Sequence, residues 1–208
     1  MKEKWENLLK HLEIRAASYA VGESFKHLEI EPDLNLKPCN ESDMAEFEAK
    51  HGIILPSEYK MFCQVFGPVT FGHDVDIGCT NLDIESDRDG FREIVSYEPF
   101  DKFDNVRREF SDKIRELIDH GMRFGGNANN ESDFWFDLRT YGLDESYDIY
   151  CVYSGGELDL HKLPVRNFFD FIREYCLGTK LYEPDLAERN TIPFEPHEFH
   201  EFFISPGD

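Results

Sequence analysis

The chain has 208 residues, of which 40% are hydrophobic and 14% aromatic, and its 43 acidic and 22 basic residues give a formal net charge of −21. The length is typical of one domain with short additions, and the aromatic content excludes a chain that is disordered throughout. The charge excludes nucleic acid and membrane surfaces as main partners, because both are bound by clustered Lys and Arg, and it favours a basic protein partner.

The cysteine usage and the N-terminal sequence indicate the cellular compartment of the protein. No run approaches the roughly 18 apolar residues of a membrane span. Residues Met1 to Ile14 interleave charged and apolar side chains, unlike the uninterrupted apolar region of a signal peptide. The five cysteines are scattered and form no CxxC pair. This usage is typical of free thiols in a reducing compartment, so the sequence predicts a cytoplasmic protein.

The first predicted element is an amphipathic helix. Apolar residues recur at spacings of three and four and share one face: Trp5, Leu8, Leu9, Leu12, Ala16 and Tyr19. The polar, proline-bearing stretch from Glu31 to Asn40 breaks this pattern and indicates a connector. Residues 1–38 are therefore predicted to form a helical extension, which belongs either to the core or to an interface.

Two short helices joined by a tight corner are predicted next. Ser42 is the expected N-cap of the first helix, and Gly52 is its expected stop because glycine adopts the left-handed conformation without steric cost. Pro56 suits the first turn of the second helix. The buried stripe of that helix is predicted to contain Tyr59, Phe62, Cys63 and Phe66.

The middle of the chain carries weaker patterns. A strand is predicted around Val75 to Ile77, followed by a loop as far as Pro99. A third helix is predicted from about Asp104 to His120, with Gly121 as its stop. The run Gly125-Gly126-Asn127 indicates a turn rather than a phosphate cradle, because neither Lys-Ser nor Lys-Thr follows it.

Alternating residues then predict an antiparallel sheet. One strand covers Phe134 to Leu138 and another covers Tyr147 to Tyr153. Ser154-Gly155-Gly156-Glu157 suits a two-residue hairpin loop, which places Tyr153 opposite Leu158. Opposed residues share a face. One face would then hold Ile149, Cys151, Tyr153, Leu158 and Leu160, and the other Tyr150, Val152, Asp159 and His161, which predicts a sheet covered on one side.

A fourth helix is predicted from about Val165 to Leu177, with Phe168, Phe171, Ile172 and Tyr175 facing inward and Gly178 as its stop. The remaining residues, Thr179 to Asp208, have no clear period. Phe199, Phe202 and Phe203 suggest that a short last helix docks there, so residues 181–208 are predicted to form a tail packed on the domain.

An ordered series of motifs resembles one known family. The series is AEFEAKHGIILPSEYKMFCQVFG, then RFGGNANNESDFWFDL, then YDIYCVYSGGELDLHKLPVRNFFDFIREYCLG, and it extends from about Asp43 to Gly178. It contains a Leu-Pro-x-x-Tyr helix start, an aromatic strand that ends in Asp, a tyrosine-rich hairpin and a Phe-Phe-x-Phe helix. In this order the motifs are similar to those of the SUKH superfamily, relatives of the fungal Smi/Knr regulators of cell-wall synthesis.

The resemblance implies an α+β fold, with a mainly antiparallel sheet and helices packed on one side, over a domain of residues 39–180. It also implies a binding role, because many bacterial members resemble immunity proteins that neutralise toxins, often nucleases. The alternative within the same fold is a regulatory or scaffold module whose partner is a cellular protein.

Patterns for metals and catalysis are incomplete. Glu85, Asp87, Asp89 and Gly90 imitate the start of a calcium loop, but position 12 is Ser96 instead of a bidentate Glu. Cys63 lies on an apolar stripe, where buried thiols are inert. The sequence therefore predicts a protein that is not an enzyme, with no catalytic, cofactor-binding or metal-ligating residue and no cofactor.

Acidic residues interleaved with aromatic ones near the sheet suggest a partner-binding surface. Trp and Tyr are enriched at the energetic centres of interfaces, and acidic patches steer basic partners. The alternative is that Trp135 covers the edge of the core and the acids are only solvated. The predicted partner-binding residues are Asp74, Asp76, Asp133, Trp135, Asp137, Tyr150, Glu157 and Asp159.

Overall fold

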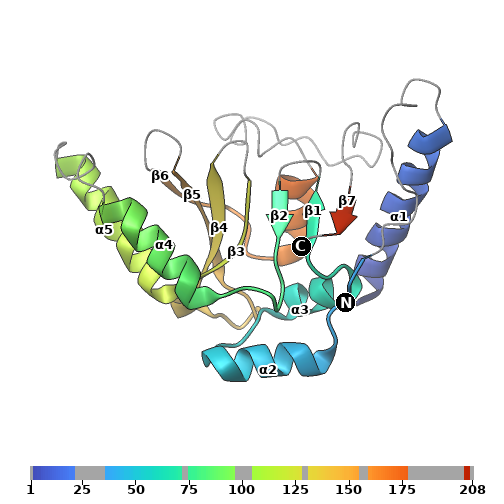
Figure 1. Cartoon of the computed structure of the whole chain (residues 1–208), viewed down its shortest axis with the longest axis horizontal. Helices are drawn as coiled ribbons and strands as arrows, with labels where there is room; N and C mark the ends of the chain where they lie inside the picture. Colours follow the sequence, from blue (N-terminus) through green and yellow to red (C-terminus); the bar gives the residue numbers. More distant parts are fainter. Residues whose placement is uncertain are drawn as a thin grey trace.

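The computed structural model describes residues 2–21, 36–71, 75–96, 105–127, 131–154, 159–177 and 204–206 (Figure 1). The helices are α1 (Lys2–Val21), α2 (Glu41–His51), α3 (Ser57–Val65), α4 (Ile84–Ser96), α5 (Asn105–His120) and α6 (Phe168–Phe171), with a 3₁₀ turn η3 (Leu138–Thr140) and a π turn η4 (Ile172–Cys176). The strands are β1 (Val69–Phe71), β2 (Val75–Ile77), β3 (Gly121–Asn127), β4 (Ser132–Asp137), β5 (Asp148–Tyr153), β6 (Asp159–Lys162) and β7 (Ile204–Pro206).

The strands form one antiparallel sheet in the order β6-β5-β4-β3-β2-β1-β7. The predicted α+β class with an antiparallel sheet is confirmed. In the C-terminal part of the chain, β7 pairs with β1. The predicted docking of Phe199, Phe202 and Phe203 lies outside the described residues.

The main core lies on one face of the sheet and is built from aromatic rings. Tyr59 of α3 packs edge-on against Phe136 of β4 and against Phe168 of α6, with ring centroids 5.6 and 4.9 Å apart. Phe124 of β3 stacks on Phe136 at 4.2 Å. Such ring pairs contribute beyond the area they bury. The predicted stripe of α3, with Tyr59, Phe62, Cys63 and Phe66, is confirmed as buried core.

Helix α1 packs on this same core. Trp5 is 0% exposed, and its ring lies edge-on to Phe62 at 5.4 Å and to Phe169 at 4.7 Å. Its indole Nε1 donates to Glu58 Oε2 at 2.9 Å, and Lys4 lies 2.7 Å from the other oxygen of that carboxylate. The N-terminal helix therefore contributes core residues.

The other face of the sheet is also covered, at one end, by the hairpin of α4 and α5 (Figure 1). A second, smaller core lies beneath this hairpin and contains Phe91, Val95, Ile114, Leu117, Ile118, Trp135 and Val152. Helices therefore lie on both faces of the sheet, whereas the sequence predicted them on one side only. Helix α4 was predicted as loop, because only Ile84, Phe91 and Val95 interrupt its polar sequence at positions that become buried.

The predicted register of the β5–β6 hairpin is wrong by one residue. Tyr153 pairs with Asp159 and Val152 with Leu160, so the connection is longer than the two-glycine turn. A shift by one residue turns every side chain of a strand to the opposite face. Leu160 therefore joins Val152 on the α4–α5 face, while Asp159 and His161 lie on the face of Cys151.

Glycines predicted to stop a helix or form a turn instead lie in β3. Gly121 is the first residue of that strand, and Gly125 and Gly126 pair with β2 and β4 beside a β-bulge. A Cβ atom at Gly125 would collide with the Asp76 carbonyl oxygen, so glycine allows β2 to approach. The two short helices are confirmed, but Asn40 replaces Ser42 as the N-cap, in a capping box with Asp43.

Gly67 holds the segment before α2 against the end of α3. Its φ is +70°, and a Cβ atom there would overlap the Lys37 carbonyl oxygen. We expect Gly67→Ala to lower the free energy of unfolding by about 3 kcal/mol, since strain and displacement of Lys37 combine. Gly52→Ala is the matched control, because Gly52 has φ +64° with open space around it, and should cost about 1 kcal/mol. Urea unfolding of both variants measures the difference, and equal losses would contradict this role of Gly67.

Candidate protein-interaction surface

The structure divides the predicted partner-binding residues between the two faces of the sheet. Alternation along β4 and its register with β3 and β5 place five of them on the α4–α5 face, whereas Asp159 pairs with Tyr153 on the opposite face. The two remaining residues, Asp74 and Glu157, lie outside the described residues. The five that share a face are Asp76, Asp133, Trp135, Asp137 and Tyr150.

Trp135 does not lie on the surface. It is 0% exposed beneath α4 and α5, with its ring edge-on to Phe91 at 5.0 Å. Its indole Nε1 is buried and has no hydrogen-bond partner among the described residues. The α4–α5 hairpin, whose first helix was predicted as loop, therefore covers Trp135, which does not have the exposure that its prediction as a contact residue requires. Tyr150, opposite Trp135, packs partly buried against the same cluster.

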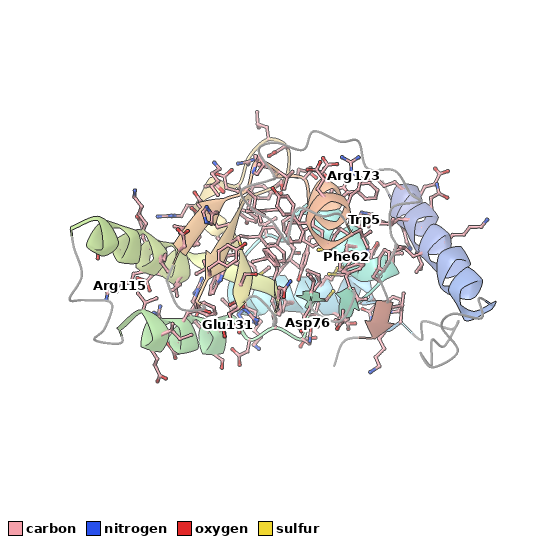
Figure 2. All side chains as sticks on the ribbon, turned by 90° about the horizontal axis from the view of Figure 1, so that it is seen from above. Trp5, Phe62, Asp76, Arg115, Glu131 and Arg173 are labelled. Atoms are coloured by element: carbon pink, nitrogen blue, oxygen red, sulfur yellow. The ribbon has the colours of Figure 1, made fainter. Side chains whose placement is uncertain are left out.

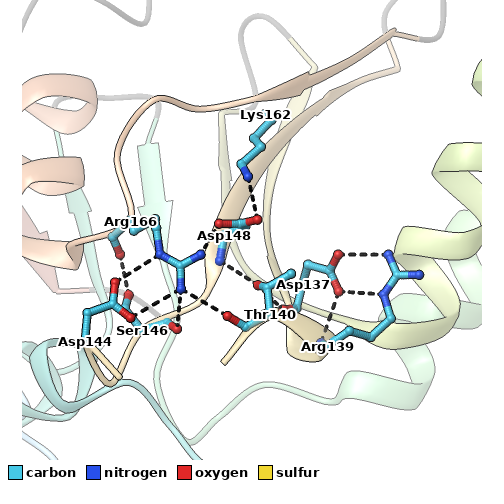
Figure 3. Close-up of polar contacts among 8 residues, drawn as sticks. All are labelled: Asp137, Arg139, Thr140, Asp144, Ser146, Asp148, Lys162 and Arg166. Carbon is cyan, nitrogen blue, oxygen red and sulfur yellow. Dashed lines mark hydrogen bonds and ion pairs between the residues drawn. The ribbon is translucent and has the colours of Figure 1, made fainter. Parts of the chain in front are cut away.

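Asp137 is also buried, and its contacts lie within the fold (Figure 3). Its two oxygens accept hydrogen bonds from Arg139 Nε and Nη2, both at 2.8 Å, and Oδ1 also accepts from the Arg139 backbone N–H. Burial alone would raise the pKa of Asp137, but these bonds and the Arg139 charge outweigh it and hold the pKa below the usual 3.8. Asp137 thus closes the β4–η3 turn.

We expect Asp137→Asn to lower the free energy of unfolding by about 2 kcal/mol at neutral pH, because charge-assisted bonds to Arg139 are lost. A carboxylate whose pKa is depressed stabilises the fold above its unfolded pKa and loses this effect as pH falls through its folded pKa. The difference between wild type and variant should therefore be constant above pH 3.8 and shrink below it. Urea unfolding across pH measures this, and a gap that widens in acid would contradict it.

Asp144→Asn is the matched control for that experiment. Asp144 also pairs with an arginine, with Arg166 Nε at 3.0 Å, but half of its side chain is exposed. Exposed pairs contribute at most about 1 kcal/mol. Arg166 keeps its contacts to Asp148 and to the Thr140 carbonyl, so this variant should be nearly neutral (Figure 3).

Asp133 belongs to a compact charge cluster. Arg123 Nε lies 2.5 Å from Asp133 Oδ1, and its Nη1 lies 3.5 Å from Asp87 Oδ1 on α4. Gly126 makes room for this arrangement, because a Cβ atom there would come within 2.8 Å of the Asp133 carboxylate and 3.0 Å of Arg123. One guanidinium is therefore shared by two carboxylates, which leaves the cluster negative.

The carboxyl groups of Asp87 and Asp133 are partly buried, which disfavours their ionised forms. Burial raises the pKa of both above the usual 3.8, and Arg123 only partly offsets this. The charges of Asp133 and Asp83 raise the pKa of Asp87 further. A carboxyl with a raised pKa is one whose ionised form gains from an additional positive charge nearby. An additional positive charge near the cluster would therefore stabilise the ionised forms of Asp87 and Asp133.

Two exposed acids extend this cluster toward the open part of the sheet. Asp76 of β2 pairs with Gly126, which pairs with Asp133, so the two aspartates stand two strand spacings apart, about 10 Å, on either side of Gly126, where the Arg123 guanidinium lies. Thr70 Oγ1 donates to Asp76 at 2.6 Å. Glu131, at φ +52°, directly precedes β4. Figure 2 shows it on the same side of the molecule as Asp76. We call Asp76, Asp87, Glu131 and Asp133 the acidic face.

Within the acidic face, the sequence predicted Asp76 and Asp133 as binding residues, but not Asp87 or Glu131. Asp87 was considered only as part of a calcium loop, and the structure places it on α4. Arg123, which organises the cluster, contacts residues that are distant in sequence, so only the strand register reveals it. Asp159 pairs with His161 at 2.8 Å on the opposite face.

A second exposed feature is apolar. Ile54 and Tyr141 are 54% and 40% exposed, and Leu143 is fully exposed. The loops that carry them are joined, because Tyr147 Oη donates to the Ile54 carbonyl at 2.8 Å and the Ser57 backbone N–H donates to the Glu145 carbonyl at 3.3 Å. We call Ile54, Tyr141 and Leu143 the apolar corner.

Across residues 2–177 and 204–206, leaving out the gaps named above, no three His, Cys, Asp or Glu side chains are grouped to hold a metal ion. Within the same described parts, no helix is both long enough and apolar enough to cross a membrane.

Comparison with known proteins identifies the family. The sequence profile described as the SMI1 / KNR4 family (SUKH-1) matches residues 38–203, which is most of the chain. Searches of curated proteins and of solved structures returned no match. The matched range excludes α1, although Trp5 of that helix lies in the core. This profile match, over an α+β fold with an antiparallel sheet, places the chain in the SMI1/KNR4 (SUKH-1) family.

Proposed function

We propose that this chain is a cytoplasmic immunity-type protein that binds a basic protein toxin, such as a nuclease, through its acidic face and neutralises it by occlusion. The observation that carries this proposal is that one guanidinium, Arg123, is shared by Asp87 and Asp133, and that the exposed acids Asp76 and Glu131 lie on the neighbouring strand β2 and just before β4. Family membership supports a binding role, since many relatives resemble immunity proteins. No bond is made or broken in the partner, and no cofactor takes part.

The charge of the molecule favours rapid capture of such a partner. A net charge of −21 produces a long-range field that attracts a basic protein, and a local acidic cluster orients it. Arg123 holds Asp87 and Asp133 in place before binding, so little side-chain entropy is lost when a lysine or arginine of the toxin docks against the acidic face. Because Trp135 is buried, the face lacks a large aromatic contact, and its main effect should be on association.

The experiment first searches for a toxin gene beside the gene for this chain and then uses the toxin domain found there; the lack of any such gene would count against the proposal. Cells that express the toxin should survive when the full chain is co-expressed. The double variant Asp76→Lys/Glu131→Lys should lose this protection, since both side chains are exposed and their reversal repels a basic surface. The control is Glu41→Lys/Glu46→Lys on α2, which changes the net charge equally at exposed positions away from the acidic face.

Protection lost only in the Asp76/Glu131 variant supports the proposal. Equal protection by both variants would overturn it, and equal loss in both would mean that net charge acts without a defined site. This interpretation requires that both variants retain the wild-type melting temperature.

In the regulatory or scaffold alternative, the partner would bind at the apolar corner, and this can be tested separately. Exposed apolar side chains on two joined loops are typical of contacts that bury hydrophobic surface. If Leu143→Asp abolishes partner binding while the Asp76/Glu131 variant does not, the partner binds at this corner, and the electrostatic proposal fails.

A further inference from the structure

Three of the five cysteines, far apart in sequence, meet at one place in the fold. Cys39 precedes α2, Cys63 lies on α3 and Cys79 follows β2. Cys63 and Cys79 belong to the buried core, and Cys39 packs against it while remaining partly exposed. The Cys39 sulfur lies 3.6 Å from Thr80 Oγ1, and Thr80 is the chain neighbour of Cys79. All three are free thiols.

The backbone fixes Cys39 at the edge of this cluster. Its N–H donates to the Cys63 carbonyl at 2.8 Å, and the preceding segment is held against Gly67, where only glycine leaves room for Lys37. On the other side, the Cys79 N–H donates to Asn81 Oδ1 at 2.9 Å, and Tyr59 Oη donates to the Gly78 carbonyl at 2.7 Å. Cys39 and Cys79 are therefore carried by two short segments, each tied to its surroundings by hydrogen bonds.

The surroundings distinguish the three thiols chemically. The hydrogen bond from Cys79, helped by those from Thr80, lowers the pKa of Cys39 to about 6, against the effects of burial and of the Asp43 charge on α2. Burial raises the pKa of Cys63, and it raises that of Cys79 well above 9.0. Burial likewise raises the pKa of the nearby Tyr59. At neutral pH the cluster thus holds one thiolate, at its most exposed member, beside neutral thiols.

We propose that Cys39 is a thiol-modification site that reacts with hydroperoxides and other small electrophiles, and that Cys79 is its resolving partner. The Cys39 thiolate attacks the nearer oxygen of a hydroperoxide, the O–O bond breaks, and the leaving alkoxide or hydroxide takes up a proton. Cys39 is thereby oxidised to a sulfenic acid and the peroxide is reduced to alcohol or water. Cys79 then attacks the sulfenic sulfur, and its thiol proton and the sulfenic OH leave as water, giving a Cys39–Cys79 disulfide.

The cysteine cluster is separate from the surfaces used in the proposed function. The cluster lies at residues 39, 63 and 79–80, and none of these residues belongs to the acidic face or to the apolar corner. A disulfide there would join the segment before α2 to the segment after β2. Oxidation would therefore covalently fix two parts of the chain that are now held together by hydrogen bonds.

The first test measures the pH dependence of alkylation by iodoacetamide, followed at each cysteine by peptide mass spectrometry on the folded full chain. Cys39 should be alkylated first, with a rate midpoint at about pH 6. In Cys79→Ala the midpoint should rise toward 9.0, and in Thr80→Val it should rise by less, since Cys79 remains. Cys151→Ala, which removes a buried thiol elsewhere, should leave it unchanged. A wild-type midpoint near 9.0 would overturn the proposal.

The second test treats the full chain with hydrogen peroxide. The wild type should lose two hydrogen atoms in mass, with Cys39 and Cys79 found in one disulfide-linked peptide pair. Cys79→Ala should instead gain one oxygen at Cys39 and react with a sulfenic-acid probe. A disulfide between Cys39 and Cys63, or oxidation that begins at another cysteine, would contradict the assigned roles. Melting curves of each variant confirm that the folded protein is being compared.

Discussion

Trp5→Ala is expected to lower the free energy of unfolding by about 3–5 kcal/mol, the range for deletion of a buried aromatic side chain. Trp5 fills a space between α3 and the segment around Phe168 and Phe169, and its Nε1 satisfies the buried Glu58 carboxylate. Removal leaves both a cavity and a carboxylate with one contact fewer. Urea unfolding followed by circular dichroism measures the loss.

Two controls separate the contributions of packing and hydrogen bonding at this position. Trp5→Phe keeps a ring but loses the bond to Glu58, so it should cost less than Trp5→Ala. Glu6→Ala changes an exposed residue of the same helix and should be nearly neutral. A loss below about 1 kcal/mol for Trp5→Ala would mean that α1 is an appendage rather than part of the core.

Trp135→Ala should also cost about 3–5 kcal/mol, since its indole lies at the centre of the second core. This loss should appear first at the α4–α5 hairpin, which packs on the sheet through Trp135 and the few apolar residues around it. Hydrogen exchange should therefore show reduced protection of α4 and α5, with β3 and β5 still protected.

Trp135→Phe is the informative companion variant. It keeps the edge-on contact with Phe91 in part, and it removes a buried N–H that lacks a partner among the described residues. It should therefore be much milder than Trp135→Ala. If Trp135→Ala instead left stability unchanged while weakening partner binding, Trp135 would be a contact residue after all, and its position beneath α4 and α5 would be contradicted.

The helices predicted correctly from the sequence are those whose own residues show which face is buried. Helices with a clear apolar stripe, such as α3 and α5, were predicted close to their observed bounds, because burial imposes the period of 3.6. Helix α4 was missed because few of its residues are buried, and β3 was missed because its glycines serve the approach of β2, which depends on a distant segment.

The errors at the site likewise concern residues whose positions depend on distant parts of the chain. A hairpin register depends on the exact loop length, and a slip of one residue moved Asp159 away from the acids it was grouped with. Whether Trp135 faced solvent depended on a hairpin whose first helix was not recognised. The excess of acid was visible from composition, but the position of Arg123 between Asp87 and Asp133 requires the folded chain.

The most direct test of the acidic face is the association rate constant between the full chain and a basic toxin domain against which it protects cells, measured by stopped flow across ionic strength. From about 0.05 to about 0.5 M salt, the wild-type rate constant should fall by about tenfold or more, because screening removes electrostatic steering. Asp76→Lys/Glu131→Lys should associate more slowly at low salt and converge with the wild type at high salt, while Glu41→Lys/Glu46→Lys stays near the wild type. Rate constants that are flat with salt and equal in all three proteins would contradict the account.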